Sequence, residues 1–294
     1  MRTRITSQRI EVLNFLLRYR YITTRFILRL IPRDIKLNTI NRALYEMRYA
    51  ALVEKPEKSR WTNNSLYKDD AYEISTRGKN ALKSHDSLRP FPRDYANFFH
   101  DQFTSLCAAA FEIMCVEHPD LEYFSWWDIV KSPKVPQDTI ESAKPHLLQI
   151  DKVKGIQDYA PFAVGHKNKR RVFFMGIEAD MATEQRSTGL TSSHRATLEK
   201  KYSFWMNVFR KEVYRSHYGF PNAYIVFLFS SEGSMQSAMQ LFEDRFPEGS
   251  TKVLFGHAPN FRRLERSADV EDFTTMTWNR VGHGDFHIEA HLTR

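Results

Sequence analysis

The positive charge of this chain is concentrated in its first third. Residues 1–90 contain 19 Lys and Arg against 9 Asp and Glu, a net charge of +10, and the remaining residues contain 24 against 26, a net charge of −2. A length of 294 residues suits two domains. The split therefore predicts a compact domain that binds a polyanion, joined to a second domain with a different role.

The first part of the chain has the spacing of three helices. Apolar residues recur at helical intervals in residues 7–21 and 37–51, and a short helix over residues 25–30 is expected between them. The apolar stripe of the third helix consists of Leu37, Ile40, Leu44, Met47 and Ala51. Two short strands are expected next, one over residues 52–55 and one that starts at Ala71 and leads into a helix.

The face of the third helix opposite the apolar stripe is polar and aromatic. Side chains of these types can hydrogen-bond to bases, contact phosphates or stack on bases. The candidates on this face are Asn38, Thr39, Arg42, Tyr45 and Tyr49. The polar stretch between the two expected strands adds Lys58, Arg60 and Trp61. Together these residues form a candidate DNA-binding surface.

Three helices followed by a β-hairpin resemble the winged helix-turn-helix family. Leu52-Val-Glu is similar to the end of its recognition helix, and Tyr72-Glu-Ile-Ser-Thr-Arg-Gly is similar to its wing strand. The resemblance covers about residues 5–85 and implies binding to double-stranded DNA, although winged helices also serve as protein-interaction modules. Prolines and charges after residue 84 indicate a linker, so we expect domains over residues 1–90 and 95–294.

The second part of the chain alternates strands and helices, which predicts an α/β domain with a mixed β-sheet, or α+β for the whole chain. Residues 223–229 form the near-continuous apolar run expected of a buried parallel strand. Further strands are expected at residues 123–129, 147–153, 158–164, 171–179 and 252–256, and helices at residues 98–116, 193–215 and 234–246.

Carboxylates gather at the ends of two neighbouring predicted strands. Asp158 opens one strand, and Glu178 and Asp180 end the next, two residues apart and therefore on the same face. Acids at the end of a buried strand are costly unless they are solvated, paired or bound to a cation. These three carboxylates predict a hard-oxygen site for Mg²⁺ or Mn²⁺, with Glu184 at its periphery. A solvated rim of the strand is the alternative.

The helix predicted after these strands offers a cation for the same site. Lys201 lies beside the apolar stripe of this helix, whereas Lys200 lies opposite it. Lys201 can therefore lean toward the carboxylates, where a nuclease needs positive charge to stabilise the reacting phosphate. The alternative is that both lysines are solvated. The stripe consists of Leu198, Tyr202, Trp205 and Phe209.

This order of acids and lysine resembles the PD-(D/E)xK nuclease superfamily. Gln157-Asp158 stands for its "PD" motif and Glu178-Ala-Asp180 for its "ExK" motif, with Asp180 in the place of the lysine. Some members carry that lysine on the next helix, as Lys201 would. More narrowly, Phe99-His-Asp-Gln-Phe and Gly176-Ile-Glu-Ala-Asp-Met-Ala-Thr-Glu resemble motifs of the replication-relaxation family and of restriction-nuclease-like plasmid relaxases. Both join a winged helix to such a domain.

The resemblance implies a DNA-binding protein of a mobile element, such as a plasmid, phage or satellite. It implies that the protein nicks or cleaves DNA with a divalent metal during replication or mobilisation, through Asp158, Glu178, Asp180 and Lys201. Because Asp180 departs from the motif, a sequence-specific replication factor or transcriptional regulator with an inactive nuclease-like domain is the alternative. A third hypothesis is a module that recruits other replication or transfer proteins, and homodimerisation is left open.

Other features narrow the class of protein. No apolar run is long enough for a membrane-spanning helix and no secretory signal is visible, so we expect a cytoplasmic protein without a membrane partner. Two cysteines, Cys107 and Cys115, cannot form a disulfide framework. Residues 282–291 alternate histidines with acids, and we expect a polar tail there in preference to a metal site.

Overall fold

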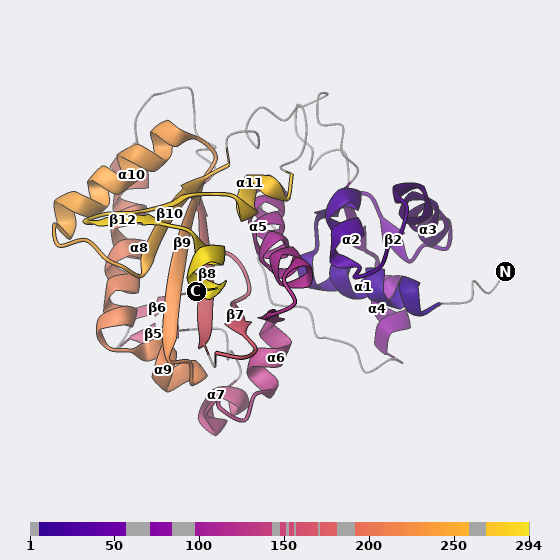
Figure 1. The fold of residues 1–294 in the computed structure, drawn as a ribbon, viewed down its shortest axis with the longest axis horizontal. Helices are drawn as coiled ribbons and strands as arrows, with labels where there is room; N and C mark the ends of the chain where they lie inside the picture. Colours follow the sequence, from indigo (N-terminus) through magenta and orange to yellow (C-terminus); the bar gives the residue numbers. More distant parts are fainter. Residues whose placement is uncertain are drawn as a thin grey trace.

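The chain consists of a small N-terminal region and a larger region built on a β-sheet (Figure 1). We call these the N-terminal region, residues 6–83, and the sheet region, residues 98–293. The computed structural model describes residues 6–56, 71–83, 98–142, 148–150, 153–155, 157–169, 171–180, 192–258 and 269–293. The expected linker therefore lies outside the described residues.

The N-terminal region packs its helices against a small antiparallel sheet. The strand order is β1-β3-β2. The elements are α1 (Ser7–Tyr19), β1 (Ile22–Thr23), α2 (Thr24–Leu30), α3 (Leu37–Tyr49), β2 (Val53–Glu54), β3 (Ala71–Ile74) and α4 (Thr76–Lys83). The sequence predicted the three helices and the two later strands in this order, and β1 is an addition.

Helix α3 buries most, but not all, of its predicted apolar stripe. Ile40, Leu44 and Met47 are fully buried. The stripe is wrong at its two ends, where Leu37 is 42% exposed and Ala51 is also exposed. Ala51 lies beyond the helix with φ +54, because the chain turns there to enter β2.

The sheet region is mixed, as predicted. The seven strands run in the order β12-β11-β10-β9-β8-β7-β4. Strands β8, β9 and β10 are parallel neighbours, and the other pairs are antiparallel. The seven strands are β4 (Leu121–Phe124), β7 (Phe162–His166), β8 (Arg171–Asp180), β9 (Asn222–Phe229), β10 (Val253–His257), β11 (Trp278–Arg280) and β12 (His283–Phe286). A separate hairpin pairs β5 (Leu148–Ile150) with β6 (Val153–Gly155).

Helices cover both faces of this sheet. Phe162 of β7 pairs with Met175 of β8, and Phe111 of α5 packs on Phe162 with ring centroids 5.3 Å apart. Phe174 points to the opposite face and stacks on Tyr218 of α9 at 4.8 Å. The helices are α5 (Phe98–Glu117), α6 (Trp126–Lys131), α7 (Gln137–Glu141), α8 (Ser192–Arg210), α9 (Val213–Tyr218), α10 (Glu232–Arg245), α11 (Glu271–Thr274) and α12 (Ile288–Thr293). Helices α5 and α9 therefore lie on opposite faces.

Several sequence-based boundaries are wrong, and the strand predicted over residues 147–153 is the first part of the β5–β6 hairpin. The strand predicted over residues 123–129 ends at Phe124, because the Asp128 carboxylate accepts a hydrogen bond from the Ser125 backbone N–H (2.8 Å) and starts α6. The helix predicted over residues 193–215 breaks at Glu212, which has φ +49, so that α9 forms separately. Residues 283–286 form β12 at the edge of the sheet instead of a polar tail.

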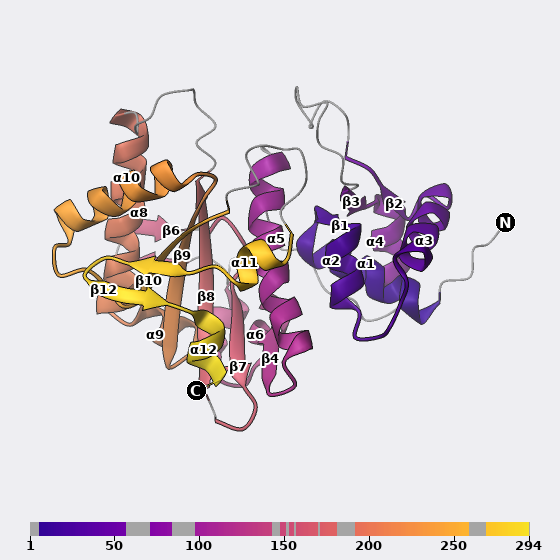
Figure 2. The ribbon, with the colours of Figure 1, turned by 45° about the horizontal axis from the view of Figure 1, so that its top comes forward.

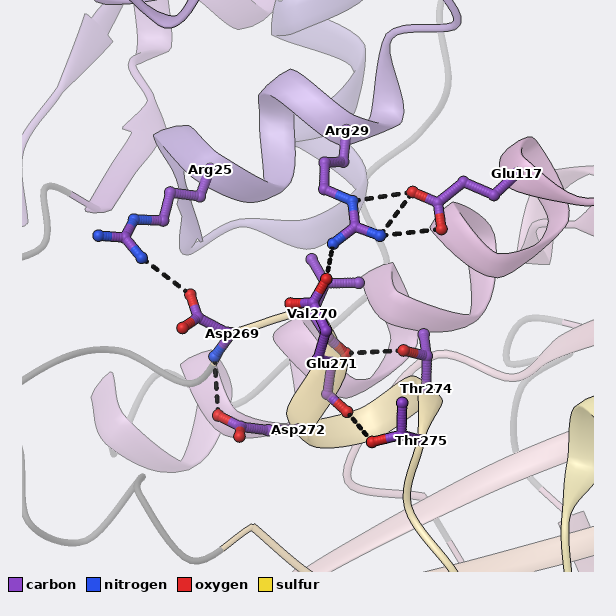
Figure 3. Close-up of polar contacts among 9 residues, drawn as sticks. All are labelled: Arg25, Arg29, Glu117, Asp269, Val270, Glu271, Asp272, Thr274 and Thr275. Atoms are coloured by element: carbon purple, nitrogen blue, oxygen red, sulfur yellow. Dashed lines mark hydrogen bonds and ion pairs between the residues drawn. The ribbon is translucent and has the colours of Figure 1, made fainter.

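The N-terminal region docks on α5 through α1 and α2, and Figures 1 and 2 show α5 between that region and the sheet. Buried apolar residues of both regions form one continuous core. Figure 3 shows the ion pairs of Arg25 and Arg29. The ion pairs across this interface are Arg18–Glu112, Arg20–Asp101, Arg25–Asp269, Arg29–Glu117 and Arg29–Glu271. None of the described helices is long and apolar enough to cross a membrane.

Candidate functional site

Asp158 lies beside the carboxyl end of β8, in the loop before β7. The prediction that Asp158 opens a strand is wrong, because β7 begins at Phe162. Backbone contacts nevertheless hold Asp158 against β8. Its N–H donates to the Ile177 carbonyl (3.2 Å), and the Ala179 N–H donates to Asp158 Oδ2 (2.9 Å). These two bonds place the Asp158 carboxylate next to Glu178.

Glu178 is a buried carboxylate with two specific neighbours. Its side chain is 4% exposed, Trp205 Nε1 donates to its Oε1 (2.9 Å), and its Oε2 lies 2.5 Å from Lys201 Nζ. Burial raises the pKa of Glu178, and the negative charge of Asp158 adds to this rise, whereas Lys201 opposes it. The net pKa lies above the usual range of a glutamate. The environment of this carboxylate is therefore unusual in both burial and charge.

Lys201 bridges the two carboxylates. Its Nζ lies 2.9 Å from Asp158 Oδ2 and 2.5 Å from Glu178 Oε2, and its side chain is 30% exposed. Burial lowers the pKa of Lys201, but the two carboxylates outweigh burial and raise it above its ordinary value. The ammonium group is therefore charged. The pKa of Asp158 is held low, since Lys201 and His100 outweigh the effect of its burial.

The arrangement of α8 explains why Lys201 reaches this cluster. Leu198, Tyr202, Trp205 and Phe209 are all buried, as the predicted stripe requires. Lys201 follows the edge of that stripe to the sheet, whereas Lys200 is exposed. The geometry agrees with the predicted orientation of both lysines, and it leaves their chemical roles to experiment.

His100 belongs to the same cluster, and sequence reasoning missed its position. It lies in the first turn of α5, with Nε2 at 3.4 Å from Asp158 Oδ2 and Nδ1 at 3.8 Å from Asp101 Oδ1. Burial lowers the pKa of His100, but hydrogen bonds and charges of Asp101 and Asp158 outweigh burial and raise it to about 9. The motif that begins at Phe99 contains His100, but nothing in the sequence spacing indicates that His100 lies near Asp158.

The remaining predicted acids do not complete a metal cluster in the part of the chain that the structure describes. Asp180 ends β8, where its carbonyl accepts a hydrogen bond from the Ser230 N–H (3.3 Å), and Glu184 lies outside the described residues. Among the described residues, no group of three or more His, Cys, Asp or Glu side chains is placed to hold a metal ion. The predicted set of three carboxylates is therefore reduced here to the pair that converges on Lys201.

The two carboxylates are donors of the type that a hard divalent cation takes. Carboxylate oxygens of Asp158 and Glu178 both contact one positively charged atom, Lys201 Nζ. Carboxylates are the ligands that Mg²⁺ prefers, and Mg²⁺ usually keeps several waters and takes only one or two protein carboxylates. Two carboxylates that already share a cationic neighbour can therefore form the protein part of such a site.

The predicted DNA-binding face of α3 is exposed. The side chain of Arg42 is 82% exposed, and Tyr45 and Tyr49 are 69% and 89% exposed. Arg42 Nε donates to Glu46 Oε1 (2.9 Å) on the next turn of its own helix. Asn38 and Thr39 are exposed in the first turn. The predicted residues Lys58, Arg60 and Trp61 lie outside the described residues.

Comparisons of this chain with protein-family models, with curated proteins and with solved structures find no match. Its function is therefore inferred from the site itself and from the sequence motifs.

Proposed function

We propose that this chain binds double-stranded DNA through its N-terminal region and nicks or cleaves DNA at the cluster of Asp158, Glu178 and Lys201. The observation that carries the proposal is the convergence of both carboxylates on Lys201 at the carboxyl end of a buried strand. Charges buried in this way are costly unless they are paired, and functional sites are where perturbed carboxylates and lysines gather.

Each residue of the cluster has a chemical task under this proposal. Asp158 and Glu178 would hold Mg²⁺ or Mn²⁺, and Trp205 orients Glu178 through its indole N–H. Such a metal, when bound, supplies Lewis-acid stabilisation and a water of lowered pKa. Lys201 carries the positive charge that stabilises the phosphate during the reaction or orients the attacking water. Asp180 and Glu184 are secondary candidates for the metal.

The order of elements supports both family resemblances. An acid precedes β7, carboxylates end the neighbouring strand β8, and the lysine follows on α8, which is the arrangement of a PD-(D/E)xK site with its lysine moved to the helix. In the N-terminal region, three helices precede a pair of antiparallel strands, as in a winged helix. A mobile-element nickase or relaxase that acts in replication or mobilisation combines these two parts.

One observation favours a second candidate function. Lys201 contacts both carboxylates directly, and the described residues include no ready group of three metal ligands. A stable Lys–carboxylate cluster of this kind would suit a nuclease-like scaffold that has lost catalysis. The second candidate is therefore a sequence-specific DNA-binding replication factor or transcriptional regulator.

Plasmid nicking separates the two candidates. The protein is incubated with supercoiled plasmid in Mg²⁺, in Mn²⁺ and in EDTA, and DNA binding is measured on the same preparation by fluorescence polarisation. A nuclease converts the plasmid to open-circular or linear form only with metal. Binding without conversion in either metal contradicts the nuclease proposal and supports the regulator.

The adjacent lysines provide a matched pair for the same assay. Lys201→Ala should lower the nicking rate at saturating DNA by roughly 100-fold, because it removes the charge beside the reacting phosphate. Lys200→Ala should leave the rate unchanged, since Lys200 is exposed. Equal losses in the two variants, or a larger loss in Lys200→Ala, would reject the assigned role of Lys201.

A further inference from the structure

Arg20 has a strained backbone at the junction of α1 and β1. It caps the end of α1 with φ +58 and ψ −71, a combination that residues other than glycine rarely adopt. Such conformations cost of order 1–3 kcal/mol and persist where the surroundings fix them. The contacts of the Arg20 side chain show what fixes this one.

The side chain of Arg20 is held from two directions. It forms an ion pair with Asp101 of α5, and the two side chains are only 12% and 9% exposed. Its guanidinium also lies over the Tyr21 ring, 4.4 Å from the centroid. Tyr21 in turn packs edge-on against Phe98, with ring centroids 4.7 Å apart. Arg20 and Tyr21 therefore both contact the first turn of α5, through Asp101 and Phe98.

That first turn carries His100 to the carboxylate cluster. Asp101 approaches His100 Nδ1 at 3.8 Å, and His100 Nε2 lies 3.4 Å from Asp158 Oδ2. Asp158 then contacts Lys201 at 2.9 Å. An unbroken row of charged groups therefore runs from the N-terminal region to the candidate site.

We propose that Arg20 is a positioning residue, which holds Asp101 and His100 so that His100 stays against Asp158, and so couples docking of the N-terminal region to the carboxylate cluster. The expected effect of Arg20 on catalysis rests on the proposed nuclease function. Partners that orient the direct ligands of a metal site typically change metal affinity or activity by roughly 10–100-fold when they are mutated. Arg20 acts two contacts further out, through Asp101 and His100, so we expect an effect at the lower end of that range.

The other arginines of the interface provide the control. Arg29 pairs with Glu117 of α5 and with Glu271 of α11 (Figure 3). Glu117 is the last residue of α5, at the opposite end of this helix from His100. Its side chain is 32% exposed, so its loss should be tolerated by the fold. Arg29→Gln thus weakens the same interface without touching the first turn of α5.

The test compares Arg20→Gln, Arg20→Lys and Arg29→Gln in the full chain. Gln at position 20 keeps a non-glycine backbone, shortens the side chain and removes the guanidinium charge, and circular dichroism checks the fold. The ring resonances of His100, recorded by long-range proton–nitrogen NMR in metal-free protein, should move in Arg20→Gln and return toward their wild-type positions in Arg20→Lys. They should stay in place in Arg29→Gln. If Arg20→Gln does not fold, the same comparison is made with Arg20→Met, which keeps most of the aliphatic part of the side chain and removes the charge.

Kinetics of plasmid nicking provide the second readout. Arg20→Gln should lower kcat by roughly tenfold with KM for DNA unchanged, and Arg29→Gln should change neither. Unchanged His100 resonances in Arg20→Gln, or equal movement in Arg29→Gln, would overturn the inference. If the wild-type protein does not nick DNA, the proposed function fails, and the NMR comparison alone decides whether Arg20 positions His100.

Discussion

The arginines of the N-terminal region lie in two contrasting environments. On α3, the side chain of Arg42 is 82% exposed and pairs with a glutamate of its own helix. Arg18 of α1, Arg20 just after α1 and Arg29 of α2 are 20%, 12% and 32% exposed and pair with acids of the sheet region. The first environment leaves a cation accessible to a phosphate, whereas the second commits it to an acid within the chain.

This contrast changes the meaning of the net charge of +10 in residues 1–90. A count of charges treats every arginine as available to a polyanion. In the structure, Arg18, Arg20, Arg25 and Arg29 instead pair with acids of α5 and of residues 269–271. Part of the basic charge therefore joins the two regions, and the net charge overstates how many cations a polyanion could reach.

A large effect on stability, greater than those at Arg42 and Arg29, is expected at the Arg18–Glu112 pair, whose side chains are 20% and 15% exposed. Arg18 Nη1 lies 2.5 Å from Glu112, which also accepts a hydrogen bond from the Tyr19 hydroxyl. Arg18→Ala should lower the free energy of unfolding by about 3–5 kcal/mol, because it leaves the charge of Glu112 buried without its partner. Urea unfolding followed by circular dichroism measures this. A loss below about 1 kcal/mol would mean that the interface does not depend on the pair.

An intermediate effect, on DNA affinity instead of stability, is expected at Arg42. Arg42→Ala should weaken binding of duplex DNA by about tenfold, which corresponds to about 1.4 kcal/mol, and should reduce the slope of log affinity against log salt by about 1. Its unfolding curve should match that of the wild type, since the side chain lies in solvent. Unchanged affinity across a salt series would exclude this face of α3 from the DNA interface.

The smallest effect is expected at Arg29, in a partly exposed ion-pair network. Its Nη2 lies 2.6 Å from Glu117 Oε1, and it also pairs with Glu271 (Figure 3). Arg29→Ala should lower the free energy of unfolding by about 1 kcal/mol, and added salt should reduce the difference because exposed pairs are screened. DNA affinity should not change. A tenfold loss of affinity would place Arg29 in the DNA-binding surface, so that Arg29 and Arg42 would no longer differ in role.

Local patterns in the sequence predicted the parts of the fold that depend on neighbouring residues. The apolar stripe of α8 correctly predicted that Lys201 faces the sheet and Lys200 faces solvent. The prediction of a strand over residues 123–129 was wrong, although the sequence contains the signal for the helix that forms there. Ser125 and Asp128 have the spacing of a helix N-terminus. Apolar and aromatic residues alone do not separate a strand from a short buried helix.

These local patterns did not predict contacts between segments that are distant in the sequence. His100 meets Asp158 only because α5 packs on the sheet with its first turn at the end of β8, and sequence spacing does not reveal such packing. The pairing of α1 and α2 arginines with α5 acids was missed for the same reason. Glu178 and Asp180 were found because they end a strand, which is a local signal, whereas Asp158 was assigned to a strand that begins only at Phe162.

We expect Glu178 to act in DNA cleavage and not in DNA binding, and one variant separates these two roles. Glu178→Gln keeps the size of the side chain and removes its charge. Nicking of supercoiled plasmid in Mg²⁺ or Mn²⁺ and affinity for duplex DNA are measured on the same preparations of wild-type and variant protein. We predict a loss of nicking of at least about 100-fold, with unchanged affinity. Nicking by Glu178→Gln at the wild-type rate would contradict the account.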